Sequence, residues 1–503
     1  IEVRRKIEKD KGSKFYINNK EVRAKDAQMF FADLSTGAHS PSIISQGRIG
    51  ALVTAKPTDR RAILEEAAGI SGLHVRRHEA ELRLNAAENN LKRADELRRQ
   101  QEKQLANLQK QAEEATKYKL ISEEIKKIEE KNLLRELKYG VQEIGTYFHF
   151  NGHKLINFCS NNYLGLCSHE RIKTAAKKAV DSYGVGSGAS RLVSGSSLPH
   201  LEVENESAVF FEKESAIFFS NGYTAALGTL GAILQPDDIV IIDRLCHASL
   251  IDGAKLSGAI LRSFPHNNLD KLETILNTTT KANNKNNRIL IVTEGIFSMD
   301  GDSPDLSKIV SLKKKYNALL LVDEAHSFGI CGEKGKGTLH QNNLSEQADF
   351  IMATFGKSAG AAGAITATSK VWRDLIINKA RSFIYSTAPM PSQAAAASEG
   401  LRIIQEDEGN LRREKLRDNI NLLCTKLNLN IPEGAIIPII VGEESTSIQI
   451  SNKLFESGIY APAIRYPTVA RGSARIRITL SSDHTDKNIT ELADILLSQK
   501  IIK

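Results

Sequence analysis

The residue with the clearest chemical potential is Lys357, which follows an apolar run at residues 350–355. The run predicts a buried strand, and the segment after it (GKSAGAAGA) carries no other bulky side chain. An amine that is partly desolvated at the end of such a strand has a lowered pKa and becomes a nucleophile toward an aldehyde. A lone Gly-Lys pair is more often a surface loop, so the hypothesis depends on a second motif.

That second motif is ALLLVDEAHSFG at residues 318–329. Its five apolar residues predict a strand buried on both faces, as in parallel sheets. The strand delivers Asp323 and then His326 to its carboxyl end, where open α/β sheets bind ligands. A lysine for a Schiff base and an aspartate for a pyridinium nitrogen are what pyridoxal phosphate (PLP) requires, and a histidine can reach the phenolic oxygen. Taken alone, Asp323 is better explained as a helix N-cap.

Length and composition limit the alternatives. The chain has 503 residues, 41% of them hydrophobic, which predicts more than one globular domain. No apolar run reaches the roughly 18 residues of a membrane span, and the charged N-terminus is unlike a signal peptide, so we expect a cytoplasmic protein. Five scattered cysteines without a CxxC pair argue against a disulfide framework or a metal site. A net charge of +8 is mild and does not indicate nucleic-acid binding. Because the chain starts at Ile1, we expect residues upstream of it.

The first part of the chain differs from the rest. Residues 1–8 and 14–23 flank the turn signal DKGS and predict a hairpin, and residues 24–34 and 58–70 predict helices. Residues 75–134 contain neither proline nor glycine. An a/d seam crosses them at Leu84, Ala87, Leu91, Ala94, Leu105, Leu108, Ala112 and Ala115, and after a slip at Tyr118, Ile121, Ile125 and Ile128. The pattern fits a coiled-coil arm and a solvated long helix almost equally well.

Two segments here carry a resemblance. SIISQGRI, followed by KPTDRRAILEEAAGISGL and the predicted long helix, resembles the N-terminal ATPase head of bacterial SMC chromosome-segregation proteins over about residues 1–130. The resemblance implies that Gln46 is a Q-loop glutamine near the nucleotide metal. No GxxxxGK[ST] phosphate loop occurs in the sequence, and the signature motif and Walker B strand are also missing. We therefore predict an ATPase remnant without activity.

The pattern changes near Lys138, where short apolar runs begin to alternate with helical segments. This alternation predicts an α/β fold with a mostly parallel sheet, and from about Phe383 a smaller α+β region. We expect four parts: a partial SMC-like head at 1–75, a coiled coil or long helix with the junction at 76–134, a PLP-binding large domain at 135–382, and a C-terminal small domain at 383–503.

A second resemblance covers about residues 120–500. SNNYLGL, GSGASRLVSGSSLPHLEVE, FFSNGYTAALGTL, DRLCHASLIDGAKLSGA, TEGIFSMDGD, VDEAHSFG, TFGKSAGAAGA and YSTAPMP follow one another in this order. Together they resemble the α-oxoamine synthases, which are PLP enzymes of fold type I. YSTAPMP and PAIRYPTVARGSARIRITL favour the 8-amino-7-oxononanoate synthases within that group.

The resemblance implies a role for each matching residue. It implies four catalytic residues. Lys357 would form the Schiff base and move protons, and Asp323 would pair with the pyridine nitrogen. His247 would stack on the ring, and His326 would bind the phenolic oxygen, with Ser298 nearby. The phosphate would lie on Gly222, Tyr223 and Thr354, where a helix N-terminus suits an anion. Arg477, helped by Asn161, would bind the amino-acid carboxylate, and Arg135 and Thr468 would meet the acyl substrate. For His247 a core histidine, and for Arg135 a surface ion pair, are the ordinary alternatives.

The implied reaction is a decarboxylative condensation of L-alanine with a pimeloyl thioester, on coenzyme A or acyl carrier protein, that gives 8-amino-7-oxononanoate for biotin. The resemblance also implies a homodimer. Three alternatives stay open at this point: a glycine-using member such as 5-aminolevulinate synthase or 2-amino-3-ketobutyrate ligase, a chromosome-structure fragment with a passenger domain, and an accidental fusion. Residues 117–134 suit both an SMC arm and the first helix of the enzyme.

Overall fold

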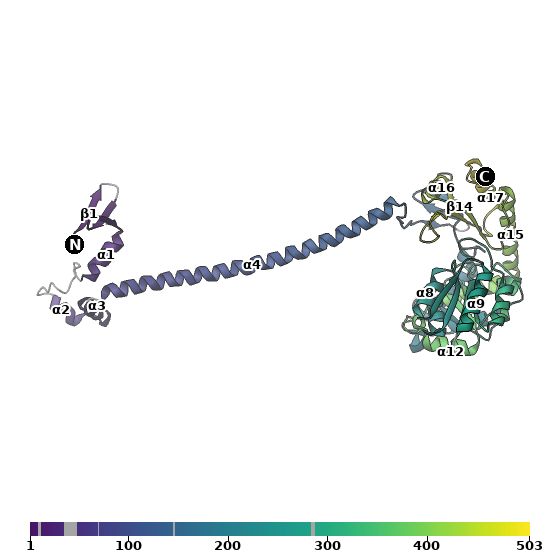
Figure 1. Cartoon of the computed structure of the whole chain (residues 1–503), viewed down its shortest axis with the longest axis horizontal. Helices are drawn as coiled ribbons and strands as arrows, with labels where there is room; N and C mark the ends of the chain where they lie inside the picture. The colour runs from purple at the N-terminus through teal and green to yellow at the C-terminus, as the bar shows by residue number, and fades with distance from the viewer. Residues whose placement is uncertain (9–11, 35–47, 69, 144–145, 283–286, 503) are drawn as a thin grey trace. The chain divides into compact units, whose positions relative to one another are not determined.

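The computed structural model describes residues 1–8, 12–34, 48–68, 70–143, 146–282 and 287–502. They divide into two compact units, Ile1–Lys126 and Lys127–Lys503. The first unit opens with the antiparallel hairpin that the sequence predicts: β1 (Val3–Glu8) pairs with β2 (Gly12–Ile17), and β2 pairs with β3 (Lys20–Val22) (Figure 1). Helices α1 (Ala24–Asp33), α2 (Arg48–Thr54) and α3 (Pro57–Ala67) follow. Gln46, the predicted Q-loop residue, lies outside the described residues.

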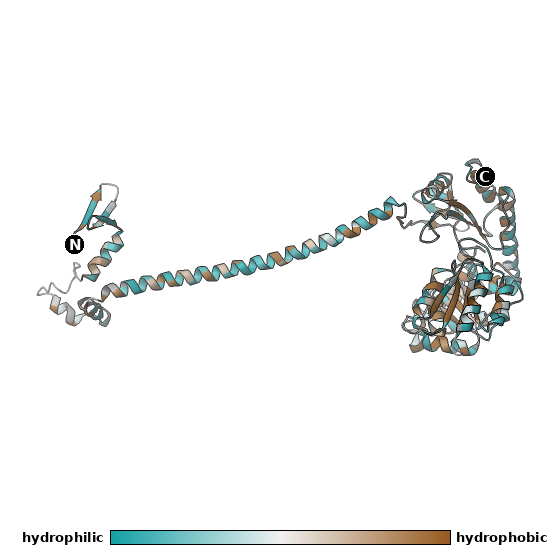
Figure 2. Ribbon diagram, in the orientation of Figure 1, coloured by the Kyte–Doolittle hydropathy of each residue, from teal (hydrophilic) through white to brown (hydrophobic). Residues whose placement is uncertain are grey.

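The long predicted helix is present as α4 (Ser71–Glu130), a single helix of 60 residues. Its seam leucines are largely exposed: Leu84 is 62%, Leu91 68%, Leu105 57% and Leu108 61% accessible. Figure 2 shows hydrophilic residues along most of α4, with hydrophobic ones only at intervals. The helix is therefore confirmed, whereas its pairing into a coiled coil stays a prediction.

The second unit is built on a seven-stranded sheet with the order β7-β13-β12-β11-β10-β8-β9. The strands are β7 (Ser215–Phe219), β8 (Ile239–Asp243), β9 (Ile260–Phe264), β10 (Ile289–Glu294), β11 (Leu319–Asp323), β12 (Phe350–Thr354) and β13 (Ala364–Thr368). β8 to β12 pair in parallel, and β13 runs antiparallel to both of its neighbours. The mostly parallel α/β sheet predicted from the alternating apolar runs is confirmed.

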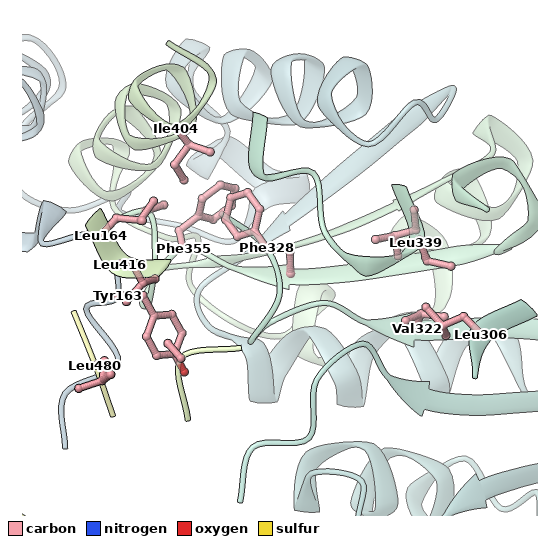
Figure 3. Close-up of a cluster of buried hydrophobic side chains, with 14 of the residues drawn as sticks. Tyr163, Leu164, Leu306, Val322, Phe328, Leu339, Phe355, Ile404, Leu416 and Leu480 are labelled. Carbon is pink, nitrogen blue, oxygen red and sulfur yellow. The ribbon is translucent and has the colours of Figure 1, made fainter. Parts of the chain in front are cut away.

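Helices cover both faces of this sheet, which explains why its inner strands are buried and mostly apolar, whereas the edge strand β9 carries Arg262 and Ser263. Alternate strand residues face two separate cores: Val322 joins one, whereas its neighbour Leu321 joins the other. The helices before, between and after these strands are α5 (Glu170–Tyr183), α6 (Leu198–Phe210), α7 (Gly222–Ile233), α8 (Ala248–Leu256), α9 (Leu269–Ala282), α10 (Leu306–Lys315), α11 (Thr338–Gln341), α12 (Lys370–Lys379) and α13 (Arg381–Ile384). Figure 3 shows part of the first core, where Val322 lies near Leu306 and Leu339, and Phe328 packs against Phe355.

The C-terminal region is the smaller α+β part that the sequence predicts. It contains α14 (Pro391–Gln405), α15 (Asp407–Leu427), β14 (Ile436–Gly442), α16 (Glu444–Glu456), β15 (Ile459–Tyr460), β16 (Ala463–Ile464), β17 (Ala474–Thr479) and α17 (Asp486–Ser498). β17 lies between β14 and β16 in an antiparallel sheet. β15 pairs with β6 (His153–Asn157), which continues through β5 (Tyr147–Phe150) to β4 (Val141–Gln142). Residues 141–157 thus join the C-terminal region rather than the large sheet. None of the described helices combines the length and apolar character needed to cross a membrane.

Candidate active site

A cavity of about 350 Å³ lies where β7, β8, β10, β11 and β12 end. All five strands run in the same direction, because β7 and β12 both pair antiparallel with β13, so their carboxyl ends meet at one edge and bring distant residues together. Eight of the predicted site residues line the cavity: Asn161, Gly222, Tyr223, His247, Asp323, His326, Thr354 and Lys357. The sequence-based expectation that these residues converge is therefore met by the geometry.

Two carboxylates lie side by side in the floor of this cavity. Glu294 ends β10 and is paired in register with Asp323 of β11. Both are buried, at 2% and 8% accessible. Burial, and then the neighbouring Asp323, raises the pKa of Glu294 to about 8. Burial also raises the pKa of Asp323, although the Lys357 ammonium and the Ala325 N–H oppose this effect. At neutral pH the pair of Glu294 and Asp323 therefore shares one proton and one negative charge.

Lys357 lies three residues beyond the end of β12, and its Nζ is 2.7 Å from Nε2 of His326. Burial lowers the pKa of Lys357 to about 8, against the opposing effect of Asp323 and Glu294. The amine is thus closer to its neutral, nucleophilic form than a solvated lysine. This is the property that the sequence predicts for it.

Both histidines of the cavity are held in place by hydrogen bonds. His247 is the N-cap of α8, its Nδ1 lies 2.8 Å from Ser249 Oγ, and its backbone N–H donates to Glu294. Burial lowers the pKa of His247. Burial, followed by the charge of Lys357, holds the pKa of His326 well below its usual value. Both rings are therefore neutral at physiological pH.

The N-terminus of α7 forms another part of the cavity wall. Asn221 caps this helix by accepting a hydrogen bond from Thr224 N–H at 2.9 Å. The N–H groups of Gly222 and Tyr223 precede the first intrahelical bond, so they point free donors at the cavity. A Cβ atom on Gly222 would lie 2.9 Å from Cγ2 of Thr354, so glycine allows the helix end to approach β12 this closely.

These residues fit PLP. A phosphate needs several donors, which α7 supplies, and the ring nitrogen needs a buried acid, which Asp323 supplies. The amine of Lys357 lines the same cavity as both groups. Among the described residues, no group of three or more potential metal ligands occurs.

Arg477 lies beside the cavity, on β17, and is 6% accessible. Its three nitrogens donate to Ser298 O at 2.6 Å, Thr479 Oγ1 at 2.8 Å and Asn161 Oδ1 at 3.1 Å. Asn161 lines the cavity, so it connects the guanidinium to the site. Ser298 is not among the cavity-lining residues and contributes its carbonyl to Arg477. The neighbouring Arg475 is equally buried but donates to Asp300 Oδ1 at 2.6 Å.

Arg135 and Thr468 are brought together away from that cavity. Arg135 Nη2 donates to Thr468 Oγ1 at 3.2 Å and to the Tyr466 carbonyl at 3.3 Å. Arg135 lines a second cavity of about 560 Å³, together with Lys138 and Arg465. The two residues expected at the acyl substrate thus contact each other, although neither lines the first cavity, and their role stays a prediction.

The loop that carries Ser298 is held by His266, which contacts one aspartate on this loop and one at the end of β8. Its Nδ1 lies 3.1 Å from Asp243 Oδ1 and its Nε2 lies 2.9 Å from Asp302 Oδ2. Burial alone would lower the pKa of His266, but these two hydrogen bonds outweigh it and raise the pKa to about 10. The imidazolium is therefore charged at neutral pH and ties the loop after β10 to the end of β8.

Sequence reasoning missed several groups at the site, above all Glu294, Asn221 and Tyr163. Glu294 gives a recognisable signal, because it ends an apolar run just as Asp323 does. Tyr163, whose Oη lies 2.6 Å from His326 Nδ1, gives none, since a tyrosine in an apolar segment is ordinarily a core residue.

Comparisons with known proteins agree with this geometry. The family model of aminotransferase class I and II matches residues 153–496. The 8-amino-7-oxononanoate synthase of Geobacter sulfurreducens is 40% identical over 374 residues, which cover 73% of this chain and 95% of that protein. The enzyme of the same name from Pelobacter propionicus is 38% identical over 379 residues, 74% of this chain and 96% of its own.

The fold also matches solved structures of related enzymes. The 8-amino-7-oxononanoate synthase of Francisella tularensis matches with a TM-score of 0.59 and 30% identity, covering 69% of this chain and 98% of that one. Serine palmitoyltransferase of S. paucimobilis, solved with a bound PLP–myriocin aldimine, matches with a TM-score of 0.71 and 26% identity, covering 77% and 98%. The chain belongs to the aminotransferase class I and II family and, within it, to the 8-amino-7-oxononanoate synthases, which are PLP-dependent acyltransferases.

Proposed function

We propose that residues 127–503 condense L-alanine with a pimeloyl thioester to give 8-amino-7-oxononanoate, carbon dioxide and the free thiol carrier. A carbon–carbon bond forms between the alanine α-carbon and the thioester carbonyl, the carbon–sulfur bond breaks, and the alanine carboxylate leaves as carbon dioxide. The observation that carries the proposal is one cavity that holds Lys357, Asp323 and the N-terminus of α7, with Arg477 next to it.

When bound, PLP supplies an aldehyde that joins amines and a pyridinium ring that withdraws electrons from the substrate α-carbon. Asp323 accepts the ring N–H and keeps that nitrogen protonated. Glu294, whose pKa of about 8 leaves it largely neutral at pH 7, would leave Asp323 as the charged carboxylate of the pair, available to the ring nitrogen. With PLP bound, His247 would stack on the ring and His326 would contact its phenolic oxygen, since both line the cavity.

The part of the cavity wall at the N-terminus of α7 binds the phosphate. Gly222 and Tyr223 donate backbone N–H groups, and Thr354 adds a hydroxyl. A helix N-terminus favours an anion by both its free donors and its dipole. The close approach between Gly222 and Thr354 keeps these donors convergent.

Lys357 takes and returns the proton at the alanine α-carbon. A base works best when its pKa lies near the working pH, and that of Lys357 is about 8. Arg477 and Asn161 hold the alanine carboxylate, because an arginine fork matches a carboxylate with two parallel hydrogen bonds. Fixing the carboxylate also selects which bond at the α-carbon is oriented for cleavage.

Arg135 and Thr468 bind the acyl substrate, whose free carboxylate requires a cation. Three cations (Arg135, Lys138 and Arg465) and two carboxylates (Glu129 and Glu136) line the second cavity, and this positive balance supports an anionic ligand there. The carrier is either coenzyme A or acyl carrier protein. We also propose a homodimer, as the matched enzymes imply, with a location in the cytoplasm.

The test is product formation by the purified chain supplied with PLP. L-Alanine and pimeloyl-CoA should yield 8-amino-7-oxononanoate by mass spectrometry, with glycine and L-serine as competing amino acids and pimeloyl-acyl carrier protein as the alternative donor. Lys357→Ala should abolish the product. Equal or faster turnover of glycine would contradict the assignment of alanine.

For residues 1–126 we propose an SMC-like ATPase remnant with a coiled-coil arm that plays no part in the reaction. The position of the predicted catalytic residues supports this, since Lys357, Asp323 and His326 all lie beyond residue 126. A protein that lacks residues 1–116 should keep the turnover number of the full chain. Loss of all activity in a truncated protein that still folds would contradict the proposal.

A further inference from the structure

Tyr163 is the one fully buried tyrosine of the described chain, and its hydroxyl faces the active-site histidine. Its ring packs in the apolar core beside Leu164, Leu416 and Leu480 (Figure 3). A phenol buried in such a core keeps its hydroxyl hydrogen-bonded, because an unpaired one is costly. Its partners here are His326 Nδ1 at 2.6 Å and, more distantly, Asn161 Oδ1 at 3.3 Å.

These contacts belong to a continuous chain of hydrogen bonds. Lys357 Nζ lies 2.7 Å from His326 Nε2, and the other ring nitrogen meets Tyr163. Tyr163 in turn reaches Asn161, whose Oδ1 also accepts from Arg477 Nη2 at 3.1 Å. One chain therefore joins the proposed base to the proposed carboxylate-binding arginine, and Tyr163 is its centre.

The number of protons on His326 and Tyr163 limits how these hydrogen bonds can be arranged. Burial holds His326 neutral, so its ring carries one N–H, and burial raises the pKa of Tyr163 to about 12, so it keeps its O–H. When Lys357 is an ammonium it donates to Nε2, which places the ring proton on Nδ1. Nδ1 then donates to the Tyr163 oxygen, and the hydroxyl donates to Asn161.

The hydrogen bonds reverse when His326 carries its proton on Nε2 instead of Nδ1. When His326 must donate from Nε2, toward a neutral amine or an oxygen, Nδ1 becomes an acceptor. The Tyr163 hydroxyl then rotates and donates to it. A hydroxyl can serve both arrangements because it is at once a donor and an acceptor. Phenylalanine could serve neither.

We propose that Tyr163 is a positioning residue that lets His326 exchange between its two neutral tautomers, so that Nε2 accepts from the charged lysine and donates once the lysine is neutral. The proposal rests on the role proposed above for Lys357 and deepens it. Five charged or titratable groups face the pair of Lys357 and His326: Asp323, Glu294, His247, Arg477 and Tyr163 itself.

The test reads the tautomer directly and needs no turnover. Solid-state nitrogen-15 NMR of histidine-labelled full-length chain without PLP distinguishes protonated from bare ring nitrogens, and His326→Asn identifies the signal by its loss. In the wild-type chain we expect the proton on Nδ1 at pH 6.5, and a growing Nε2–H population above the Lys357 pKa of about 8. A proton fixed on Nε2 at both ends of the range overturns the proposal.

Tyr163→Phe supplies the second measurement. Without the hydroxyl, Nδ1–H has no partner, so the Nε2–H tautomer should dominate even at pH 6.5. Lys357 then loses its acceptor, and its apparent pKa, read from the rate of PLP uptake, should fall by about one unit. Tyr316→Phe is the control, since its hydroxyl donates to Glu273, at 3.4 Å, and does not line the cavity. An unchanged tautomer in Tyr163→Phe contradicts the proposal, whereas a chain that shows both effects yet makes no product contradicts the proposed function alone.

Discussion

The choice between two neighbouring arginines gives the sharpest prediction. Arg475 and Arg477 lie on one strand, are equally buried and carry the same charge, yet only Arg477 connects through Asn161 to the cavity. Arg475 is neutralised by Asp300 at 2.6 Å. We therefore expect Arg477→Lys to weaken L-alanine binding and Arg475→Lys to leave it near the wild-type value.

The magnitude follows from the lost geometry. Lysine keeps the charge but loses the planar fork and one hydrogen bond to the substrate carboxylate. A hydrogen bond to a charged group contributes about 1.5–3 kcal/mol, so the dissociation constant for alanine should rise roughly 10- to 150-fold. The assay is titration of the visible cofactor band with L-alanine, with thermal unfolding midpoints to show that both variants fold. Equal effects of the two substitutions, or none for Arg477→Lys, would refute the reasoning.

Three further predictions concern other parts of the site. The rate of PLP uptake should rise with pH and level off above about 8, because only the neutral Lys357 amine adds to an aldehyde; a flat profile in stopped-flow absorbance would contradict this. Gly222→Ala should weaken PLP binding by equilibrium dialysis, since its Cβ would lie 2.9 Å from Thr354 Cγ2, and Thr354→Ser in the same chain should restore it by removing that methyl group. His266→Gln should lower the thermal midpoint most below about pH 6.5, with the difference from wild type lost as the pH rises through about 10, because the raised pKa belongs to the stabilising imidazolium. A difference that grows with pH would mean that the charge of His266 is not what stabilises the loop.

Much of this site follows from the sequence because parallel strands end at a common edge. Lys357 and Asp323 each follow an apolar run, so their convergence needs only the assumption of one sheet. The same argument applied to Glu294 would have found the second carboxylate. The long helix was predicted from its composition, although it starts at Ser71 and so includes Gly72, because helix propensity is a weak constraint.

Other features depend on contacts that no local pattern encodes. The pairing of β6 with β15 joins residues about three hundred positions apart in sequence, and each strand is short. The hydroxyl of Tyr163 meets His326 only because two separate loops are packed against one core. Likewise, the distinction between Arg475 and Arg477 depends on which loop atoms each one reaches.

The most direct test of the central claim is the visible absorption spectrum of the purified chain with PLP, recorded before and after L-alanine. We expect a band from lysine-bound PLP that is absent in Lys357→Ala and that alanine perturbs. The band should change again on adding a pimeloyl thioester, as 8-amino-7-oxononanoate forms. A folded protein that gives no such band, or a band that alanine does not change, would contradict the account.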